Sequence, residues 1–254
     1  MFYDQMDYEI KLEWGARGTR AASQRGDIVI IVDVLSFSST VVTAVQHQAI
    51  IYPYPPPLNE QAKAYAQTKN AEMVWGRAEA LREGGHSLSP LSFGAGDRAR
   101  NYVMCSLNGA LCTSAASQIP TLLIGCLLNA SAVAKSAQRF VQKLNRNITV
   151  IACGEKWSDA ANQENNLRPG IEDYLAAGAI ISQLQGSKSP EAEVCAGAYE
   201  YSKHKIERLI RESASARELR ERGDDADVIY CCQLDKYAVV PMLYEEYCTE
   251  ADNR

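Results

Sequence analysis

Short runs of β-branched and other apolar residues recur along the chain and alternate with stretches whose apolar residues have helical spacing. The runs that predict strands are "DIVIIVDV", "AIIYPY", "EMVWG", "NYVMCS", "TLLIGCLL", "NITVIACG" and "DVIYCCQL". Helices are predicted over 39–48, 59–69, 109–118, 129–144, 169–184 and, in two pieces, 190–221. Strands that are apolar throughout are covered on both faces, and their alternation with helices favours parallel pairing. The pattern predicts a three-layer α/β/α fold with a largely parallel or mixed sheet.

The chain of 254 residues is long enough for one large domain or two small ones. We expect two similar α/β halves, residues 1–118 with the loop at Asp33 and residues 119–254 with Glu172 and Asp173, or else a single domain. A stretch over 76–101 is rich in Gly, Ser and Arg and has no clear periodicity. Loops of that length inside compact domains are usually functional or disordered.

Composition and charge narrow the class of protein. The chain is 46% hydrophobic and 22% charged, as ordinary globular proteins are, and its net charge of -5 argues against a general binder of nucleic acid or membrane surfaces. The first twenty residues carry acids where a signal peptide needs an apolar core, and no apolar run reaches the roughly 18 residues of a membrane span. The eight cysteines form no CxxC pair and are interpreted as reduced thiols. These features predict a cytoplasmic protein, and the frequency of pairing among enzymes of this size suggests a homodimer.

Polar residues gather where predicted strands end, which is where ligands bind in open α/β sheets. They are Asp33 with Ser36, Ser38, Ser39 and Thr40, then Arg77, Asn108 with Gly109, Asn129 and Glu155. Glu172 and Asp173 stand in the first turn of a predicted helix. Mg²⁺ prefers such oxygen ligands and takes one or two carboxylates together with water and substrate phosphate. The candidate metal ligands are therefore Asp33, Glu155, Glu172 and Asp173, in a metal-assisted phosphate site.

Each of these residues also has a simpler interpretation. An aspartate after a buried strand is often the N-cap of the next helix, and clustered hydroxyls belong to caps and turns as well as to phosphate cradles. The helix dipole alone favours acids at Glu172 and Asp173. The chain has no GxxxxGK[ST] or GxGxxG loop, no HExxH pair and no GxSxG elbow. Their absence argues against nucleotide folds of those types, zinc sites and serine hydrolases.

Seven segments, taken together and in order, resemble one family. They are "VDVLSFSSTVVTA", "GGHSLSPLSF", "CSLNGALC", "GCLLNASAVA", "ACGEKW", "LRPGIEDYLAAGAI" and "SPEA". The chain resembles the 2-phosphosulfolactate phosphatases from about residue 25 to residue 241. The resemblance implies a Mg²⁺-dependent phosphoric monoester hydrolase that converts 2-phosphosulfolactate, a small anionic phosphoester, to 3-sulfolactate and phosphate. That step is known from coenzyme M biosynthesis.

The resemblance also implies roles for individual residues. Asp33, Ser89 with Pro90, Asn108 with Gly109, Asn129, and Glu172 with Asp173 match the family's motifs. Ser36 stands where family members commonly carry arginine, and this difference concerns the substrate. We expect Asp33, Glu172 and Asp173 to be catalytic, acting at the metal directly or through water. The expected substrate-binding residues are Ser36, Ser38, Ser39, Thr40, Arg77, Ser89, Asn108, Gly109, Asn129 and Arg168.

Several alternatives remain open from the sequence. Water attacks the phosphoryl group directly, or Asp33 accepts it first. The substrate is 2-phosphosulfolactate or another small phosphorylated hydroxy acid. A third alternative is a relative that binds anions without catalysis.

Overall fold

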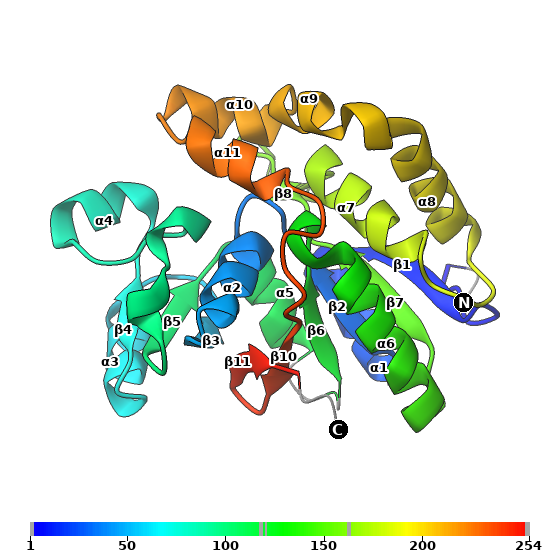
Figure 1. Cartoon of the computed structure of the whole chain (residues 1–254), viewed down its shortest axis with the longest axis horizontal. Helices are drawn as coiled ribbons and strands as arrows, with labels where there is room; N and C mark the ends of the chain where they lie inside the picture. The colour runs from blue at the N-terminus through cyan, green and yellow to red at the C-terminus, as the bar shows by residue number, and fades with distance from the viewer. Residues whose placement is uncertain (1–2, 117–118, 120, 162–163, 252–254) are drawn as a thin grey trace.

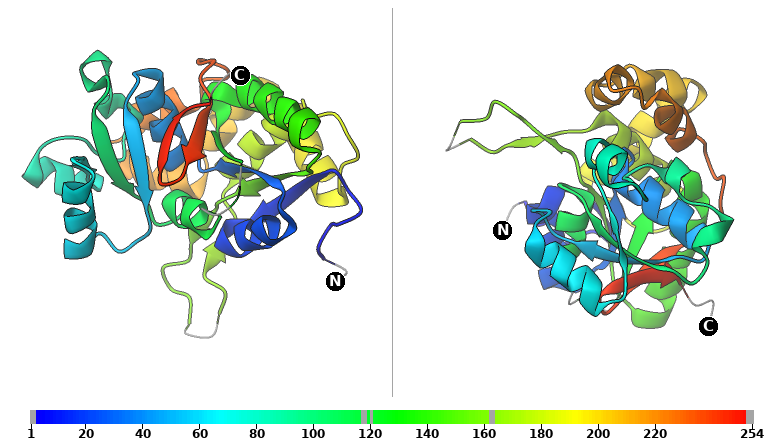
Figure 2. Two further views of the ribbon diagram at one scale, coloured as in Figure 1. Left: turned by 90° about the horizontal axis from the view of Figure 1, so that it is seen from below. Right: turned by 90° about the vertical axis from the view of Figure 1, so that its left-hand side faces the viewer.

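The computed structural model describes residues 3–116, 119, 121–161 and 164–251 of the chain. Nine strands of these residues form one sheet in the order β1-β7-β2-β6-β10-β11-β3-β5-β4. They are β1 (Ile10–Trp14), β2 (Ile28–Val32), β3 (Ile50–Tyr54), β4 (Glu72–Val74), β5 (Asn101–Cys105), β6 (Leu122–Gly125), β7 (Ile148–Ala152), β10 (Pro241–Tyr244) and β11 (Tyr247–Glu250). Two further short strands, β8 (Glu155–Lys156) and β9 (Leu167–Arg168), pair with each other at the base of an arm that projects from the body of the molecule (Figure 2).

The helices cover both faces of the large sheet. They are α1 (Gly15–Arg25), α2 (Phe37–Gln46), α3 (Glu60–Thr68), α4 (Arg77–Glu83), α5 (Gly109–Ala115), α6 (Ala130–Leu144), α7 (Ile171–Ile181), α8 (Pro190–Ser202), α9 (Ile206–Arg211), α10 (Ala214–Glu221) and α11 (Asp225–Cys231). The left view of Figure 2 shows α1 and α5 on one face and α2 and α6 on the other. Helices α8 to α11 run along the top of Figure 1. The layers confirm the predicted α/β class.

Four single-turn 3-10 helices complete the regular structure of the described residues: η1 (Pro90–Ser92), η2 (Ala95–Asp97), η3 (Leu127–Asn129) and η4 (Lys203–Lys205). Together with α4, η1 and η2 occupy much of the predicted long loop over 76–101. No helix within the described parts of the chain combines the length and the apolar character that a membrane span needs.

Strand β2 lies between β7 and β6, and every one of its five residues is buried. Its sequence, "IVIIV", is β-branched throughout, and such residues suit a strand that is covered on both faces. All pairs among β1, β7, β2 and β6 are parallel, as are those among β3, β5 and β4. The predicted, largely parallel sheet is thus confirmed.

The hairpin β10–β11 joins the two parallel groups of strands. Strand β10 is antiparallel to β6 and to β11, and β11 is antiparallel to β3. In the hydrogen-bonded ladder the two groups therefore run in opposite senses. Strands β6 and β7, from the C-terminal half of the chain, flank β2 from the N-terminal half. The division between residues 118 and 119 does not coincide with a division of the sheet.

One predicted strand is wrong. The run "DVIYCCQL" lies largely in α11, which begins after Asp224 and has Asp225 and Asp227 in its first turn. Acids at this position are favoured by the helix dipole, and the buried residues Val228 and Cys231 are three apart, which is a helical spacing. The apolar run by itself did not distinguish a short helix from a strand.

Candidate active site

Asp33 closes strand β2 and is held by backbone donors from two segments. Its Oδ1 accepts the N–H of Phe37 at 3.2 Å, and its Oδ2 accepts the N–H of Gly109 at 2.8 Å. The residue is 5% exposed. Burial raises the pKa of Asp33 to about 6, although these two N–H bonds act in the opposite direction. The carboxylate therefore ties the start of α2 to the start of α5.

Asp173 is a second buried link between loops. Its Oδ1 accepts the N–H of Val34 at 2.7 Å, and its Oδ2 accepts the N–H of Gly154 at 2.8 Å. Burial raises the pKa of Asp173 well above its usual value, and the negative charges of Asp33 and Glu172 raise it further. Asp173 thus fixes the loop after β2 against the loop after β7.

Glu172 carries a buried oxygen without a partner. The residue is 2% exposed, and its Oε2 forms no hydrogen bond with any described residue. The other oxygen, Oε1, lies 2.9 Å from the point that a Cβ on Gly170 would occupy, so the glycine leaves room for the carboxylate beside the helix N-terminus. An unsatisfied buried carboxylate oxygen is costly, and a cation or a proton relieves that cost.

Glu155 follows β7 and faces a polar partner from another loop. Its Oε2 accepts a hydrogen bond from Nδ2 of Asn108 at 2.8 Å. Burial raises the pKa of Glu155 to about 8, and the nearby charge of Asp33 adds to this effect. The structure thus brings together six predicted residues from the segment after β2, the start of α5, strand β8 and the start of α7: Asp33, Asn108, Gly109, Glu155, Glu172 and Asp173.

The group of carboxylates offers the oxygen ligands that Mg²⁺ prefers, but most of these oxygens already accept hydrogen bonds. Its carboxylates repel one another, and they offer oxygen ligands only. No cluster of three or more His, Cys, Asp or Glu side chains able to hold a metal ion occurs among the described residues. Both oxygens of Asp33 and of Asp173 face backbone N–H groups. Because Mg²⁺ needs only one or two protein carboxylates, the free oxygen of Glu172 is the natural first ligand.

A cavity of about 350 Å³ opens beside Glu155 and Asn108. Its walls come from the ends of β1 and β7, the starts of α1 and α5, and the base of the arm. Two cations, Arg17 and Lys156, and two acids, Glu13 and Glu155, line it together with apolar residues such as Leu111. The cavity is large enough for a small organic anion and meets the group of carboxylates at Glu155.

Arg168, in β9, lies beside this group. It is the register partner of Glu155 in the arm, and its positive charge lowers the pKa of Glu155 against the stronger effect of burial. Its Nη2 donates to Oγ of Ser215 at 3.3 Å, and its guanidinium lies over the ring of Trp157. The position agrees with the predicted contact to a substrate anion, which stays a prediction.

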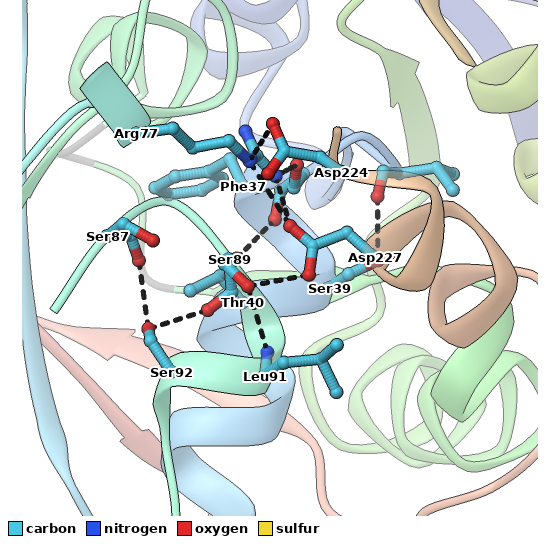
Figure 3. A network of polar contacts seen from close by, with 12 residues as sticks. Phe37, Ser39, Thr40, Arg77, Ser87, Ser89, Leu91, Ser92, Asp224 and Asp227 are labelled. Atoms are coloured by element: carbon cyan, nitrogen blue, oxygen red, sulfur yellow. Dashed lines mark hydrogen bonds and ion pairs between the residues drawn. The ribbon is translucent and has the colours of Figure 1, made fainter. Parts of the chain in front are cut away.

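Arg77 and Ser89 form a separate network with two aspartates of the C-terminal helices (Figure 3). Ser36 belongs to the same network through its contact with Arg77. Nη2 of Arg77 donates to Oγ of Ser36 and to Asp227, each at 2.7 Å. The structure therefore brings these three predicted residues together, but Arg77 is already paired with acidic side chains.

The remaining predicted residues bond to the backbone. The hydroxyls of Ser38, Ser39 and Thr40 donate to carbonyl oxygens of the β2–α2 segment, and all three residues are fully buried. The amide of Asn129 accepts from the N–H of Cys126 and donates to the carbonyls of Ile124 and Val239. These contacts correspond to the simpler interpretation, in which the residues shape turns, and we do not include them in the proposed ligand contacts.

Sequence reasoning missed several residues at this site. Asp227 lay in a run interpreted as a strand, and Arg17 follows β1, which was not predicted because "IKLEW" contains two charged residues. Lys11 and Glu13 of that strand are nevertheless buried. The acids at 224, 225 and 227 were the available signal for a helix start, and with it for Asp227.

Gly109 provides a direct test of this geometry. A Cβ at this position would lie 2.2 Å from Cδ1 of Phe37, whose own N–H bonds Asp33. We expect Gly109→Ala to separate α5 from the first turn of α2, to lower the free energy of unfolding by about 2 kcal/mol or more, and to lower any activity of the site. Urea denaturation measures the change in the free energy of unfolding.

Gly197 is the matched control, because it lies in α8 with no heavy atom within 4 Å of an added Cβ. Gly197→Ala is expected to be neutral or slightly stabilising. Equal stability of the two alanine variants would contradict the close approach of α5 and Phe37.

Comparison with known proteins places the chain in a family. Residues 17–246 match the family described as 2-phosphosulpholactate phosphatase. A probable 2-phosphosulfolactate phosphatase of Pseudothermotoga lettingae is 27% identical over 86% of this chain and 90% of its own length. Proteins with the same name from Thermosynechococcus vestitus and a Synechococcus species are 27% and 28% identical, each over 87% of this chain and 90% of the relative. These names are those of phosphoric monoester hydrolases, the predicted class of enzyme. The chain therefore belongs to the 2-phosphosulpholactate phosphatase family.

Proposed function

We propose that this protein is a Mg²⁺-dependent phosphatase that hydrolyses 2-phosphosulfolactate to 3-sulfolactate and phosphate. The observation that carries the proposal is the unpartnered Oε2 of Glu172 within a buried group of carboxylates, one of which, Glu155, lines a cavity together with Arg17 and Lys156. Family membership over residues 17–246 supports the choice of substrate. The same site would suit other small phosphorylated hydroxy acids, and Ser36 is the residue that keeps them as candidates.

Glu155 is the proposed general acid. With a pKa of about 8, its carboxyl group is mostly protonated near neutral pH and has a proton to give to the departing alkoxide oxygen. Asn108 donates to Oε2, which favours the proton on Oε1. Asp33, with a pKa of about 6, is mostly ionised at the same pH. Asp33 would act as the base or as the nucleophile, held in place by two N–H donors.

Glu172 would hold the metal through its free oxygen, with Asp33 contacting the ion directly or through water. Bound Mg²⁺ would supply Lewis-acid polarisation of the phosphoryl oxygens and neutralise their charge. The protein is acidic overall, so the anionic remainder of the substrate needs local cations. Arg17 and Lys156 in the cavity and Arg168 beside Glu155 would supply them.

The test is a phosphate-release assay on 2-phosphosulfolactate and a panel of small phosphorylated hydroxy acids, with Mg²⁺ and with chelator. We expect the highest kcat/KM for 2-phosphosulfolactate and at least about a hundredfold loss in chelator. If another ester has the highest kcat/KM, the proposed substrate is wrong and the proposed site is retained. Full activity in chelator would contradict the metal, and no release from any ester would contradict the enzyme.

We further propose that the protein works in the cytoplasm, in the coenzyme M pathway to which the reaction belongs. All eight cysteines are free and buried. This state supports a reducing compartment.

A further inference from the structure

A partly buried network of one arginine, two aspartates and two serines joins the starts of four helical segments. Arg77 begins α4, Ser89 precedes η1, and Asp224 and Asp227 belong to the start of α11. Figure 3 shows the side chains of these residues pointing toward one another above the first turns of α2. The fifth member, Ser36, is the residue that precedes α2.

Asp227 is the centre of this network. The residue is 3% exposed, and both of its carboxylate oxygens have partners. Oδ2 accepts from Nη2 and Nε of Arg77 at 2.7 and 3.2 Å, and Oδ1 accepts from Oγ of Ser89 at 2.6 Å. Two contacts from one edge of the planar guanidinium to the same carboxylate oxygen restrict its orientation, because turning the group lengthens at least one of them.

Arg77 in turn orients the hydroxyl group of Ser36. Its Nη2 donates to Oγ of Ser36, so the serine oxygen serves as an acceptor there and its own hydrogen is left to donate elsewhere. Within the described residues, Oγ of Ser36 donates no hydrogen bond and does not cap α2. The next residue, Phe37, donates its N–H to Asp33. The free hydroxyl hydrogen of Ser36 thus belongs to the residue directly before Phe37, whose N–H contacts the proposed catalytic carboxylate of Asp33.

The charges of the network argue against a direct anion site at Arg77. Asp224 lies 3.3 Å from Nε, so two aspartates face a single arginine, and the cluster is negative overall when all three are ionised. Such a cluster attracts an anion less than a free arginine does. The network therefore orients the side chains of its members and adds no net positive charge.

We propose that Asp227 is a positioning residue, which orients Arg77 so that the hydroxyl of Ser36 donates to the phosphoryl group bound beside Asp33. This inference rests on the proposed function of the carboxylate site. It gives Arg77 an indirect role in place of the predicted direct contact. It also explains how a serine functions at position 36, where family members commonly carry arginine. In this chain the guanidinium of Arg77, from a different segment, reaches the side chain of Ser36.

The test compares Asp227→Asn with Asp225→Asn. Asp225 is in the same helical turn, but its partners are Arg211 and Arg220 at the surface. We expect Asp227→Asn to weaken the binding of inorganic phosphate, measured by calorimetry, about tenfold and to lower kcat/KM by a similar factor. Asp225→Asn should stay within twofold of the wild type. The direction is diagnostic, because the loss of a negative charge alone would strengthen phosphate binding.

A double-mutant cycle tests the route through Ser36. If Asp227 acts through Ser36, then Ser36→Ala combined with Asp227→Asn should bind phosphate as Ser36→Ala alone does. Additive losses would overturn the proposal, and so would wild-type or tighter binding by Asp227→Asn. Arg77→Lys, which keeps the charge and loses the paired N–H donors, serves as the second probe if Asp227→Asn does not fold. It should show the same loss of binding, and unchanged binding would overturn the proposal.

The two proposals fail in different ways. A wild-type protein that hydrolyses no phosphoester contradicts the enzyme, while weaker phosphate binding in Asp227→Asn would still support the positioning role. A wild-type protein that binds phosphate no better than Asp227→Asn contradicts the positioning role, whatever its activity.

Discussion

Asp33→Asn should reduce kcat for phosphate release by about a thousandfold, within the range for loss of a general base or a charge-stabilising group. The physical reason lies in its two acceptor contacts. Both carboxylate oxygens receive N–H donors, from Phe37 and Gly109. Asparagine offers one oxygen, so its NH₂ group must face one of these donors, and the negative charge next to the phosphoryl group is lost. Steady-state kinetics with 2-phosphosulfolactate or the best ester of the panel measures the effect.

Asp235→Asn is the matched control for this substitution. The carboxylate of Asp235 also accepts a backbone N–H, that of Ser131, at the start of α6 and outside the carboxylate group. We expect the control to keep activity within about twofold. Thermal unfolding of both variants separates lost chemistry from lost structure, since an unsatisfied buried donor costs about 1–3 kcal/mol. A folded Asp33→Asn variant with more than a tenth of wild-type activity would remove Asp33 from the reaction.

Without Mg²⁺, the protein should lose stability as the pH rises from about 5 to 8. The pKa of Asp33 is raised to about 6 and that of Glu155 to about 8, while ordinary carboxyl groups in the unfolded chain titrate near 4. In this range the folded state holds more protons than the unfolded state, so the free energy of unfolding falls as the pH rises. Each pKa unit corresponds to about 1.4 kcal/mol, and the sum is several kcal/mol, or roughly 10 °C in Tm.

Mg²⁺ held by Glu172 should reverse part of this loss, because the cation stabilises the ionised form of nearby Asp33 and competes with protons for that carboxylate, while Glu155 keeps its proton. We expect the rise in Tm on adding Mg²⁺ to chelated protein to be larger at pH 8 than at pH 6, as measured by calorimetry. Glu172→Gln should remove the rise, because it replaces the carboxylate with the unpartnered oxygen by a neutral amide. An equal rise at both pH values, or a full rise in Glu172→Gln, would contradict a metal bound by this residue.

The sheet and the carboxylate group were largely predictable because their signals are local. An unbroken apolar run ending in Asp33 predicts a central strand with a functional end, and Glu172 and Asp173 stand in the first turn of a helix with a recognisable start. The simpler explanation also held for part of the set. Ser38, Ser39 and Thr40 shape the turn through backbone bonds, and from sequence a phosphate cradle and a helix start use the same residue types.

The parts that could not be predicted depend on tertiary contacts or on unusual turns. Asp227 acquires its role from Arg77, which is 150 residues away, and no local pattern encodes that pairing. The hairpin β10–β11 turns at Glu245 and Glu246, with Glu245 at a φ of 53°, where glycine or asparagine is the usual signal. Strand β1 has charged residues at Lys11 and Glu13 that alternate with apolar ones, a pattern typical of an exposed strand. Both charged residues are nevertheless buried, so the pattern did not indicate a covered strand.

The hairpin also determines when the sheet becomes continuous during synthesis. Residues 241–250 provide the link between β6 and β3 in the sheet, and they leave the ribosome after the other described strands of that sheet. Until then, the two parallel groups of strands each end in an edge with unpaired backbone groups, which other chains can pair with. The nascent protein is therefore most prone to aggregation before residues 241–250 emerge, and a shortened chain that stops before Pro241 would keep both edges open.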